Sequence, residues 1–201
     1  MNSISSALLC LLLFATLQSC ESPERGCLDV EATNFDVSAD KPCEDDCCKY
    51  PQLVLSVNQE FNGAIWKQDT AYRNDIGQWF RIKSIAYYLS DIKLTQNGEA
   101  YTVSDSAKMR VFGANAGDTL TDYFTDDYLL VRRNQVDYTV GTFKNSGSFQ
   151  QFSGRLGLAG ASNDIVPRYA PSGHPLAKQS DSLWLSRSEG YVMMQIILTR
   201  D

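Results

Sequence analysis

The chain has 201 residues, 43% of them hydrophobic and 11% aromatic, which suits one domain of ordinary size with a small appendage. Its formal net charge of -6 leaves no basic surface for a phosphate backbone, and this argues against nucleic acid as a partner. His174 is the only histidine, so the sequence excludes metal sites and acid–base pairs that are built from several imidazoles.

The chain begins with an apolar run, residues 7–17, that leads into Gln18-Ser19-Cys20. The run is shorter than the roughly 20 apolar residues that a membrane-spanning helix needs, and its end resembles the lipobox of a bacterial lipoprotein. We expect residues 1–19 to be a signal peptide, Cys20 to carry the lipid and residues 20–26 to form a polar tether. The membrane is then a partner, and the protein is an outer-membrane lipoprotein. An ordinary secretory peptide or a buried N-terminal strand is the alternative.

Residues 27–51 form a cysteine-rich acidic module. It holds four of the chain's six cysteines: Cys27, Cys43, Cys47 and Cys48. An even number of clustered cysteines in an exported protein is typical of disulfides, with a zinc cluster as the alternative. Because adjacent cysteines strain a bond between them, Cys47 and Cys48 should pair with Cys27 and Cys43, in either order. The whole segment resembles a short module on exported proteins of Bacteroidota-type bacteria.

The acidic residues of this module are candidate calcium ligands, because calcium prefers oxygen ligands such as carboxylates. They are Asp36, Asp40, Glu44, Asp45 and Asp46. Their spacing is not that of an EF-hand loop, so a solvated acidic face is the other interpretation.

From residue 53 onward the chain has the pattern of β-strands separated by turns. Apolar and polar residues alternate over 53–57, and an aromatic and β-branched run over 79–94 ends at the turn Gln96-Asn97-Gly98. Further strands are expected at 101–103, 108–112, 127–131, 137–143, 149–158 and 191–200. A helical turn is expected over 119–125 and a long ordered loop over 160–182. The pattern predicts an all-β, antiparallel β-sandwich over residues 52–201, preceded by a small disulfide-stapled segment.

Several pieces of this region stand out as motifs. They are Tyr87-Tyr88-Leu89-Ser90, Gly141-Thr142-Phe143, Phe152-Ser153-Gly154, Asn163, His174-Pro175-Leu176 and Gly190-Tyr191. In this order they resemble motifs of the MbnP-like domain, a family named for a copper-associated protein of methanobactin gene clusters. The resemblance covers residues 52–200 and implies an extracytoplasmic β-sandwich that is often lipid-anchored.

The same resemblance implies an association with copper handling. Copper-associated members use histidines and an oxidisable tryptophan, with a di-haem peroxidase-like protein or a metal-transport protein as the expected partner. Those members carry two tryptophans four and six residues before the tyrosine of the Gly-Tyr motif, where this chain has Arg187 and Leu185. Asn58 stands near the place of a first-strand histidine. We therefore expect copper to bind weakly or not at all, and any binding to depend on His174.

Four residues are candidate ligand-binding groups: Asn163, His174, Trp184 and Tyr191. His174 and Met193 are candidate copper ligands, because Cu(I) accepts imidazole and thioether groups; a surface-loop histidine is the alternative. Met194, in the apolar register of the last strand, is expected in the core. Trp184, Tyr191 and Trp79 form either an exposed aromatic platform for a sugar or peptide, or part of the core.

The sequence carries no nucleophile elbow, phosphate-binding loop or zinc-protease motif. The neighbouring carboxylates Asp126 and Asp127 point to opposite faces of a strand and cannot flank one bond. We therefore predict a lipid-anchored, non-enzymatic envelope protein whose β-sandwich binds a ligand or metal, with copper handling as the function implied by the family. A cell-surface glycan-binding or adhesion module is the alternative.

Overall fold

A computed structural model describes residues 22–115, 117–133, 135–178 and 183–200. The chain divides into two compact units, Met1–Lys49 and Tyr50–Asp201. Cys20 and the expected signal peptide lie outside the described residues. Within the described ranges, no helix is long and apolar enough to span a membrane.

The first unit is a small module closed by two disulfides, Cys27–Cys48 and Cys43–Cys47. The adjacent cysteines therefore take the other two as partners, as predicted, and the structure fixes the order. Because both pairs are oxidised, these sulfurs are not thiolate ligands and the zinc alternative is wrong. The module also contains a short parallel pair, β1 (Arg25–Gly26) and β2 (Lys41–Pro42).

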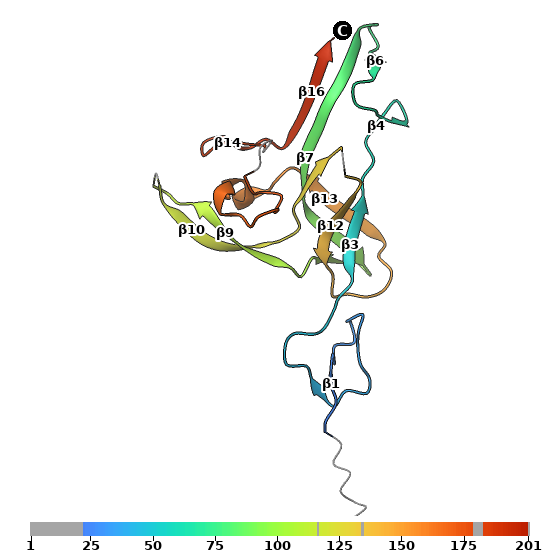
Figure 1. Cartoon of the computed structure of the whole chain (residues 1–201), viewed down its shortest axis with the longest axis vertical. Helices are drawn as coiled ribbons and strands as arrows, with labels where there is room; N and C mark the ends of the chain where they lie inside the picture. Colours follow the sequence, from blue (N-terminus) through green and yellow to red (C-terminus); the bar gives the residue numbers. More distant parts are fainter. Residues whose placement is uncertain (1–21, 116, 134, 179–182, 201) are drawn as a thin grey trace, which may run out of the picture. The chain divides into compact units, whose positions relative to one another are not determined.

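The second unit is built on one long strand, β7 (Trp79–Gln96), which contains the predicted aromatic run. It is long enough to pair with five other strands along its length, all antiparallel (Figure 1). These are β6 (Ala71–Arg73), β8 (Glu99–Thr102), β11 (Leu129–Arg132), β13 (Gln151–Leu156) and β16 (Met194–Arg200). The expected turn connects β7 to β8, with Asn97 and Gly98 at positive φ.

Shorter antiparallel pairs complete this unit. They are β3 (Gln52–Ser56) with β12 (Asp137–Thr142), β4 (Glu60–Phe61) with β5 (Ala64–Ile65), β9 (Ser106–Phe112) with β10 (Thr119–Thr125), and β14 (Trp184–Ser186) with β15 (Gly190–Tyr191). Two 3-10 turns, η1 (Gly160–Asp164) and η2 (Pro167–Tyr169), lie in the predicted long loop. The helical turn expected over 119–125 is wrong. Threonine and aromatic residues favour a strand there, and β10 pairs with β9 along its whole length.

Two hydrophobic cores lie on opposite faces of the sheet. Leu129 and Val131 belong to one core and Leu130 to the other, as the alternation of side chains along β11 requires. The first core joins β9 and residues 160–178, hereafter the 160–178 loop, to the sheet; its members include Tyr88, Met109, Ile165, Leu176 and Tyr191. The second core joins the β3–β12 pair to the sheet, with Ile92, Val103, Tyr138, Val140 and Phe143. The layered, antiparallel all-β architecture confirms the predicted fold class.

A buried carboxylate, that of Asp127, hydrogen-bonds to β7 where the regular pairing of this strand is interrupted. Asp91 has a positive φ, and the register between β7 and β13 shifts at this point. The Oδ2 atom of Asp127 accepts a hydrogen bond from the Ile92 amide at 2.6 Å. Burial raises the pKa of Asp127 above its ordinary value, because desolvation disfavours the charged form, although this hydrogen bond opposes the shift. Asp127 therefore contributes to the fold.

The side chains of the last strand, β16, are more exposed than the sequence predicted. Met194, predicted in the core, is exposed, and so is every other residue of β16. Met193 packs against the first core instead, and its Sδ atom lies 3.1 Å from the Leu158 amide nitrogen. The alternation predicted which residues share a face, but it could not show that no described layer covers either face.

Candidate functional site

Hydrogen bonds to the neighbouring strands order the 160–178 loop, as the sequence predicted. The Val166 amide donates to the carbonyl oxygen of Arg110 in β9 at 2.8 Å. The hydroxyl groups of Ser162 and Tyr128 lie 2.8 Å apart. This anchoring places the loop's candidate residues against the sheet.

Asn163 attaches the loop to the Gly-Tyr motif. Its Oδ1 atom accepts a hydrogen bond from the Tyr191 amide at 2.9 Å. Gly190 has φ +71, and a Cβ at this position would lie only 2.2 Å from Asn163 Nδ2. Asn163 and Gly190 are therefore required together by the local fold, and Asn163 lies outside the lining of the cavity described below.

Tyr191 is buried and holds the same loop from inside the core. Its hydroxyl donates to the carbonyl oxygen of Leu176 at 2.8 Å and lies 3.3 Å from that of Ile165. Its ring packs edge-to-face with Tyr88. Desolvation raises the pKa of Tyr191 well above its ordinary value, so the side chain stays a neutral donor.

Of the two interpretations of Trp184, Tyr191 and Trp79, the shared aromatic platform is wrong, and packing into the domain holds for Tyr191 and in part for Trp184. Tyr191 is fully packed, and the half-buried Trp184 stacks on Phe112 with an interplanar angle of 22°. Trp79 is exposed, at the start of β7, where it pairs with Arg73 of β6. The sequence indicated aromatic side chains but could not show which face each one would occupy.

His174 is a buried residue, only 9% exposed, so the surface-loop alternative is wrong. Its Nδ1 atom accepts a hydrogen bond from the Leu176 amide at 3.1 Å, and its Nε2 atom lies 2.9 Å from Asp126 Oδ1. A neutral imidazole has one donor and one acceptor nitrogen. The Leu176 contact therefore assigns the proton to Nε2, which donates it to Asp126.

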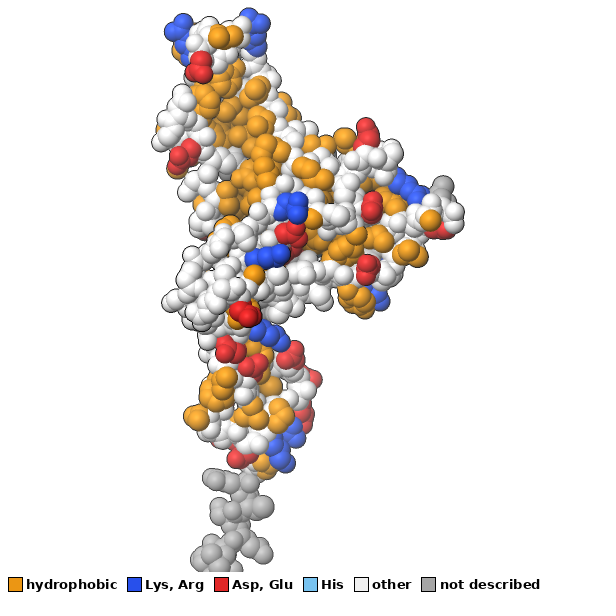
Figure 2. Space-filling model, turned by 180° about the vertical axis from the view of Figure 1, so that it is seen from behind, with side chains coloured by type: hydrophobic (Ala, Val, Ile, Leu, Met, Phe, Trp, Pro, Cys, Tyr) orange, Lys and Arg blue, Asp and Glu red, His pale blue; other side chains and the backbone are white. Residues whose placement is uncertain are grey.

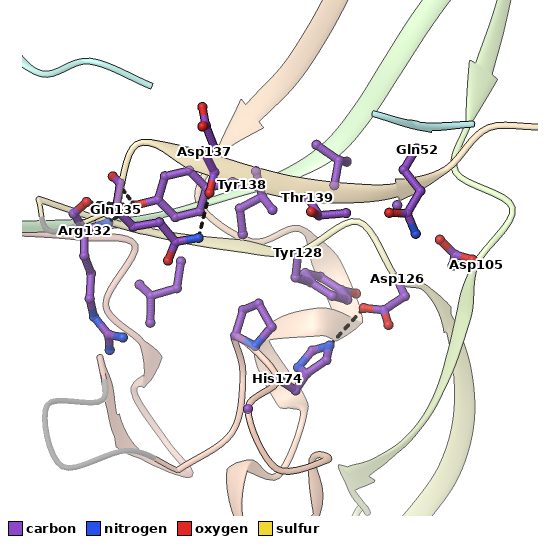
Figure 3. Close-up of a pocket in the computed structure, with 16 residues that line it drawn as sticks. Gln52, Asp105, Asp126, Tyr128, Arg132, Gln135, Asp137, Tyr138, Thr139 and His174 are labelled. Carbon is purple, nitrogen blue, oxygen red and sulfur yellow. Dashed lines mark hydrogen bonds and ion pairs between the residues drawn. The ribbon is translucent and has the colours of Figure 1, made fainter. Parts of the chain in front are cut away.

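The Asp126–His174 pair forms part of the wall of a cavity of about 520 Å³ (Figure 3). The polar and charged side chains around it come from β3, β11, β12 and adjoining segments: Gln52, Asp105, Asp126, Tyr128, Arg132, Gln135, Asp137, Tyr138, Thr139 and His174. Figure 3 shows Gln52, Asp105 and Asp126 near one end and Arg132 and Gln135 near the other.

Two further carboxylates of this cavity are fixed by the strands. Asp105 Oδ2 accepts a hydrogen bond from the Thr142 amide at 2.6 Å, and Asp137 Oδ1 accepts one from the Ser56 hydroxyl at 2.5 Å. The cavity is therefore rich in oriented oxygen acceptors. The sequence missed this role for Asp105, Asp126 and Asp137, because their partners are 37, 48 and 81 residues away.

Copper does not fit His174 as the structure presents it. A histidine ligand coordinates a metal through the lone pair of one nitrogen and donates the N–H of the other. Here the lone pair of Nδ1 already accepts the Leu176 amide, and Nε2 carries the proton that it donates to Asp126. Met193 is packed beside Leu158 and does not line the cavity. Arg187, at one of the two tryptophan positions, lies over the Phe112 ring, and Leu185, at the other, is exposed.

In the described part of the acidic module, no three of the carboxylates considered as calcium ligands lie close enough together to share an ion. Across the described residues, the only three His, Cys, Asp or Glu side chains close enough to share an ion are the disulfide-bonded Cys43, Cys47 and Cys48. Hydrogen bonds from Ser38 lower the pKa of Asp36 below its ordinary value. Glu44 pairs with Arg25, and Asp40 lies within reach of the Glu24 amide.

Comparison with known proteins supports the resemblance noted in the sequence. A family model described as MbnP matches residues 50–201, more than half of the chain. No significant match was found among curated proteins or among solved structures. With its layered antiparallel sheets and its Tyr-Tyr-Leu-Ser, His-Pro and Gly-Tyr motifs within the matched region, this chain belongs to the MbnP family.

Proposed function

We propose that this protein is a lipid-anchored, non-enzymatic protein of the bacterial envelope whose MbnP domain binds a small polar ligand in the Asp126–His174 cavity. The observation that carries the proposal is an aspartate–histidine pair, held in a fixed orientation, in the wall of a cavity of about 520 Å³. Well-oriented polar groups that converge on a concave site fix the orientation of a small ligand.

The cavity favours a ligand that presents hydrogen-bond donors. Its carboxylates, from Asp105, Asp126 and Asp137, outnumber its one guanidinium, from Arg132. Ionised carboxylates only accept hydrogen bonds, so hydroxyl or ammonium groups suit them best. A sugar unit of a glycan therefore enters our proposal as a cavity ligand, in place of one bound to an aromatic platform.

The geometry of His174 supports a binding role over a catalytic one. A general base needs a nitrogen lone pair that can take a proton from a substrate. The Nδ1 lone pair of His174 accepts from Leu176, and its Nε2–H points to Asp126. In our proposal, copper handling is a family association exercised with a di-haem peroxidase-like or metal-transport partner, without copper held by His174.

The proposed anchor rests on one thiol. Cys20→Ser is expected to move the protein from the membrane fraction to the soluble fraction, because acyl chains hold a lipoprotein through about 0.8 kcal/mol per buried methylene. Fractionation of cells followed by immunoblotting measures this. Cys10→Ser is the matched control, because Cys10 lies inside the expected signal peptide. Equal membrane retention of both variants would refute the anchor.

The cavity itself is tested by calorimetric titration with putrescine and a panel of monosaccharides. Asp126→Asn keeps an acceptor for His174 but removes the charge, and should weaken binding of a donor-rich probe about tenfold or more, the equivalent of 1.4 kcal/mol. Asp122→Asn removes one carboxylate from exposed β10, outside the cavity, and should leave binding unchanged. Loss of affinity in both variants alike, or no binding of any probe to the wild type, contradicts the proposal.

A further inference from the structure

A groove of about 360 Å³ lies where β7, β11 and β16 run beside one another. Ala86 of β7 pairs with Gln195 of β16 on one side and with Arg132 of β11 on the other. Residues directly opposite one another in a sheet share a face, so these three side chains form one row across the strands. Paired strands therefore form the base of the groove.

The charged side chains that line this groove are all positive: Lys83, Arg132 and Arg133. No Asp or Glu occurs among the described residues of its lining. Lys83 also pairs with Asp69, which lies outside the lining, so the arginines carry most of the uncompensated charge. The chain as a whole has a net charge of -6. The groove is thus a positive region on an acidic chain, and it favours an anionic ligand.

Arg133 is held in a fixed orientation at this groove. Its guanidinium carbon lies 5.2 Å from the centre of the ring of Trp66, a buried residue. Its Nη1 atom donates a hydrogen bond to the Oε1 atom of Gln68, and the side chain is exposed. A guanidinium has five N–H donors, so this arrangement leaves donors for a ligand. Their planar fork matches two oxygens of a phosphate group.

The rest of the lining suits the sugar part of a ligand. Gln68, Ser84 and Gln195 offer amide and hydroxyl groups, which both donate and accept hydrogen bonds. Ile85 and Ile197 add apolar surface, and Figure 2 shows hydrophobic side chains gathered along this part of the sheet. Apolar walls with a few placed polar groups are typical of small-molecule sites.

We propose that this groove binds a phosphorylated sugar, whose phosphate group is held by Arg133 with the support of Lys83 and Arg132. Its volume lies within the usual range for small ligands, about 300–1,000 Å³. Arg133 and Lys83 do not line the Asp126–His174 cavity, so this is a second site with the opposite charge preference. A phosphorylated sugar occurs either free or as the headgroup of an envelope lipid.

The proposal predicts that the full chain binds glucose 1-phosphate in calorimetric titration at low ionic strength. Arg133→Met keeps an apolar stem over Trp66 but removes the charge, and should raise the Kd about tenfold or more. Arg73→Met is the matched control, because Arg73 is also exposed and lies 5.8 Å from the centre of a tryptophan ring, that of Trp79, outside the groove. It should leave the Kd unchanged. Any binding of glucose itself should be the same in the wild type and in Arg133→Met.

Lys83→Met gives a second test that leaves the contact with Trp66 intact, and it should raise the Kd for glucose 1-phosphate about threefold or more. Circular dichroism checks that each variant keeps the wild-type fold. Equal effects of Arg133→Met and Arg73→Met overturn the proposal. So does unchanged affinity in both Arg133→Met and Lys83→Met.

Vesicles distinguish the two sources of the phosphorylated sugar. The Cys20→Ser chain, which lacks the proposed anchor, is sedimented with phosphatidylcholine vesicles that contain lipid A, a lipid with a phosphorylated sugar headgroup. Binding that Arg133→Met weakens identifies the lipid headgroup as the ligand. Binding of glucose 1-phosphate without binding of these vesicles identifies a free sugar phosphate. A chain that binds neither probe contradicts the proposal.

Discussion

Gly190→Ala is expected to destabilise the MbnP domain by about 2–4 kcal/mol, the sum of backbone strain and a lost buried hydrogen bond. Gly190 has φ +71, a region that side-chain-bearing residues rarely adopt, and its new Cβ would lie 2.2 Å from Asn163 Nδ2. To relieve this contact Asn163 must move, and its hydrogen bond from the Tyr191 amide is then lost. Urea unfolding, followed by tryptophan fluorescence, measures the change.

Gly98→Ala is the matched control for this prediction. Gly98 also has a positive φ, +85, but no heavy atom beyond its chain neighbours lies within 4 Å of the place that a Cβ would take. Its substitution therefore carries only the strain, about 1–2 kcal/mol. If both variants lose the same stability, the proposed link from Asn163 to the Gly-Tyr motif does not hold the 160–178 loop.

The larger elements of the fold could be predicted from the sequence because their signals are local. The aromatic run of β7, the turn at Asn97-Gly98 and the alternation of β3 depend on residues close in the chain. The disulfide partners followed from the strain between adjacent Cys47 and Cys48, although their order did not. These signals need no knowledge of what packs against them.

The sequence-based predictions were wrong where contacts between distant parts of the chain decide the secondary structure or the burial of a residue. Residues 119–125 include types that favour a strand but show no strong period, and their pairing with β9 along the whole length decides that they form β10. Met194 has the alternation of a core residue, but no described layer covers its face. Burial depends on what lies opposite, and the pattern of one strand does not contain that information.

The sequence identified some residues around the candidate site as ligand-binding groups, but it did not show that they also hold the 160–178 loop in place. His174, Asn163 and Tyr191 do come together through the 160–178 loop, but mainly as structural hydrogen-bonding groups. Trp184 pairs with Tyr191 in the β14–β15 hairpin and packs on Phe112. The cavity was not predicted, because its carboxylates come from segments far apart in the chain.

We propose that His174 is a hydrogen-bonding wall residue of the cavity, fixed with its proton on Nε2, and that it does not bind copper. As the only histidine of the chain, it gives one set of imidazole signals in a long-range ¹H–¹⁵N correlation spectrum. Nitrogen shifts distinguish a protonated from an unprotonated ring nitrogen, so the tautomer is read directly. Asp126→Asn, which keeps the acceptor, should leave the tautomer unchanged.

The most direct measurement is this spectrum recorded before and after one equivalent of Cu(I) is added under anaerobic conditions. We expect an Nε2–H tautomer whose signals do not move, and no stoichiometric copper retained after gel filtration, in wild type or in His174→Ala. An Nδ1–H tautomer whose Nε2 signal shifts with Cu(I), together with bound copper that His174→Ala abolishes, would contradict the account and make His174 a metal ligand.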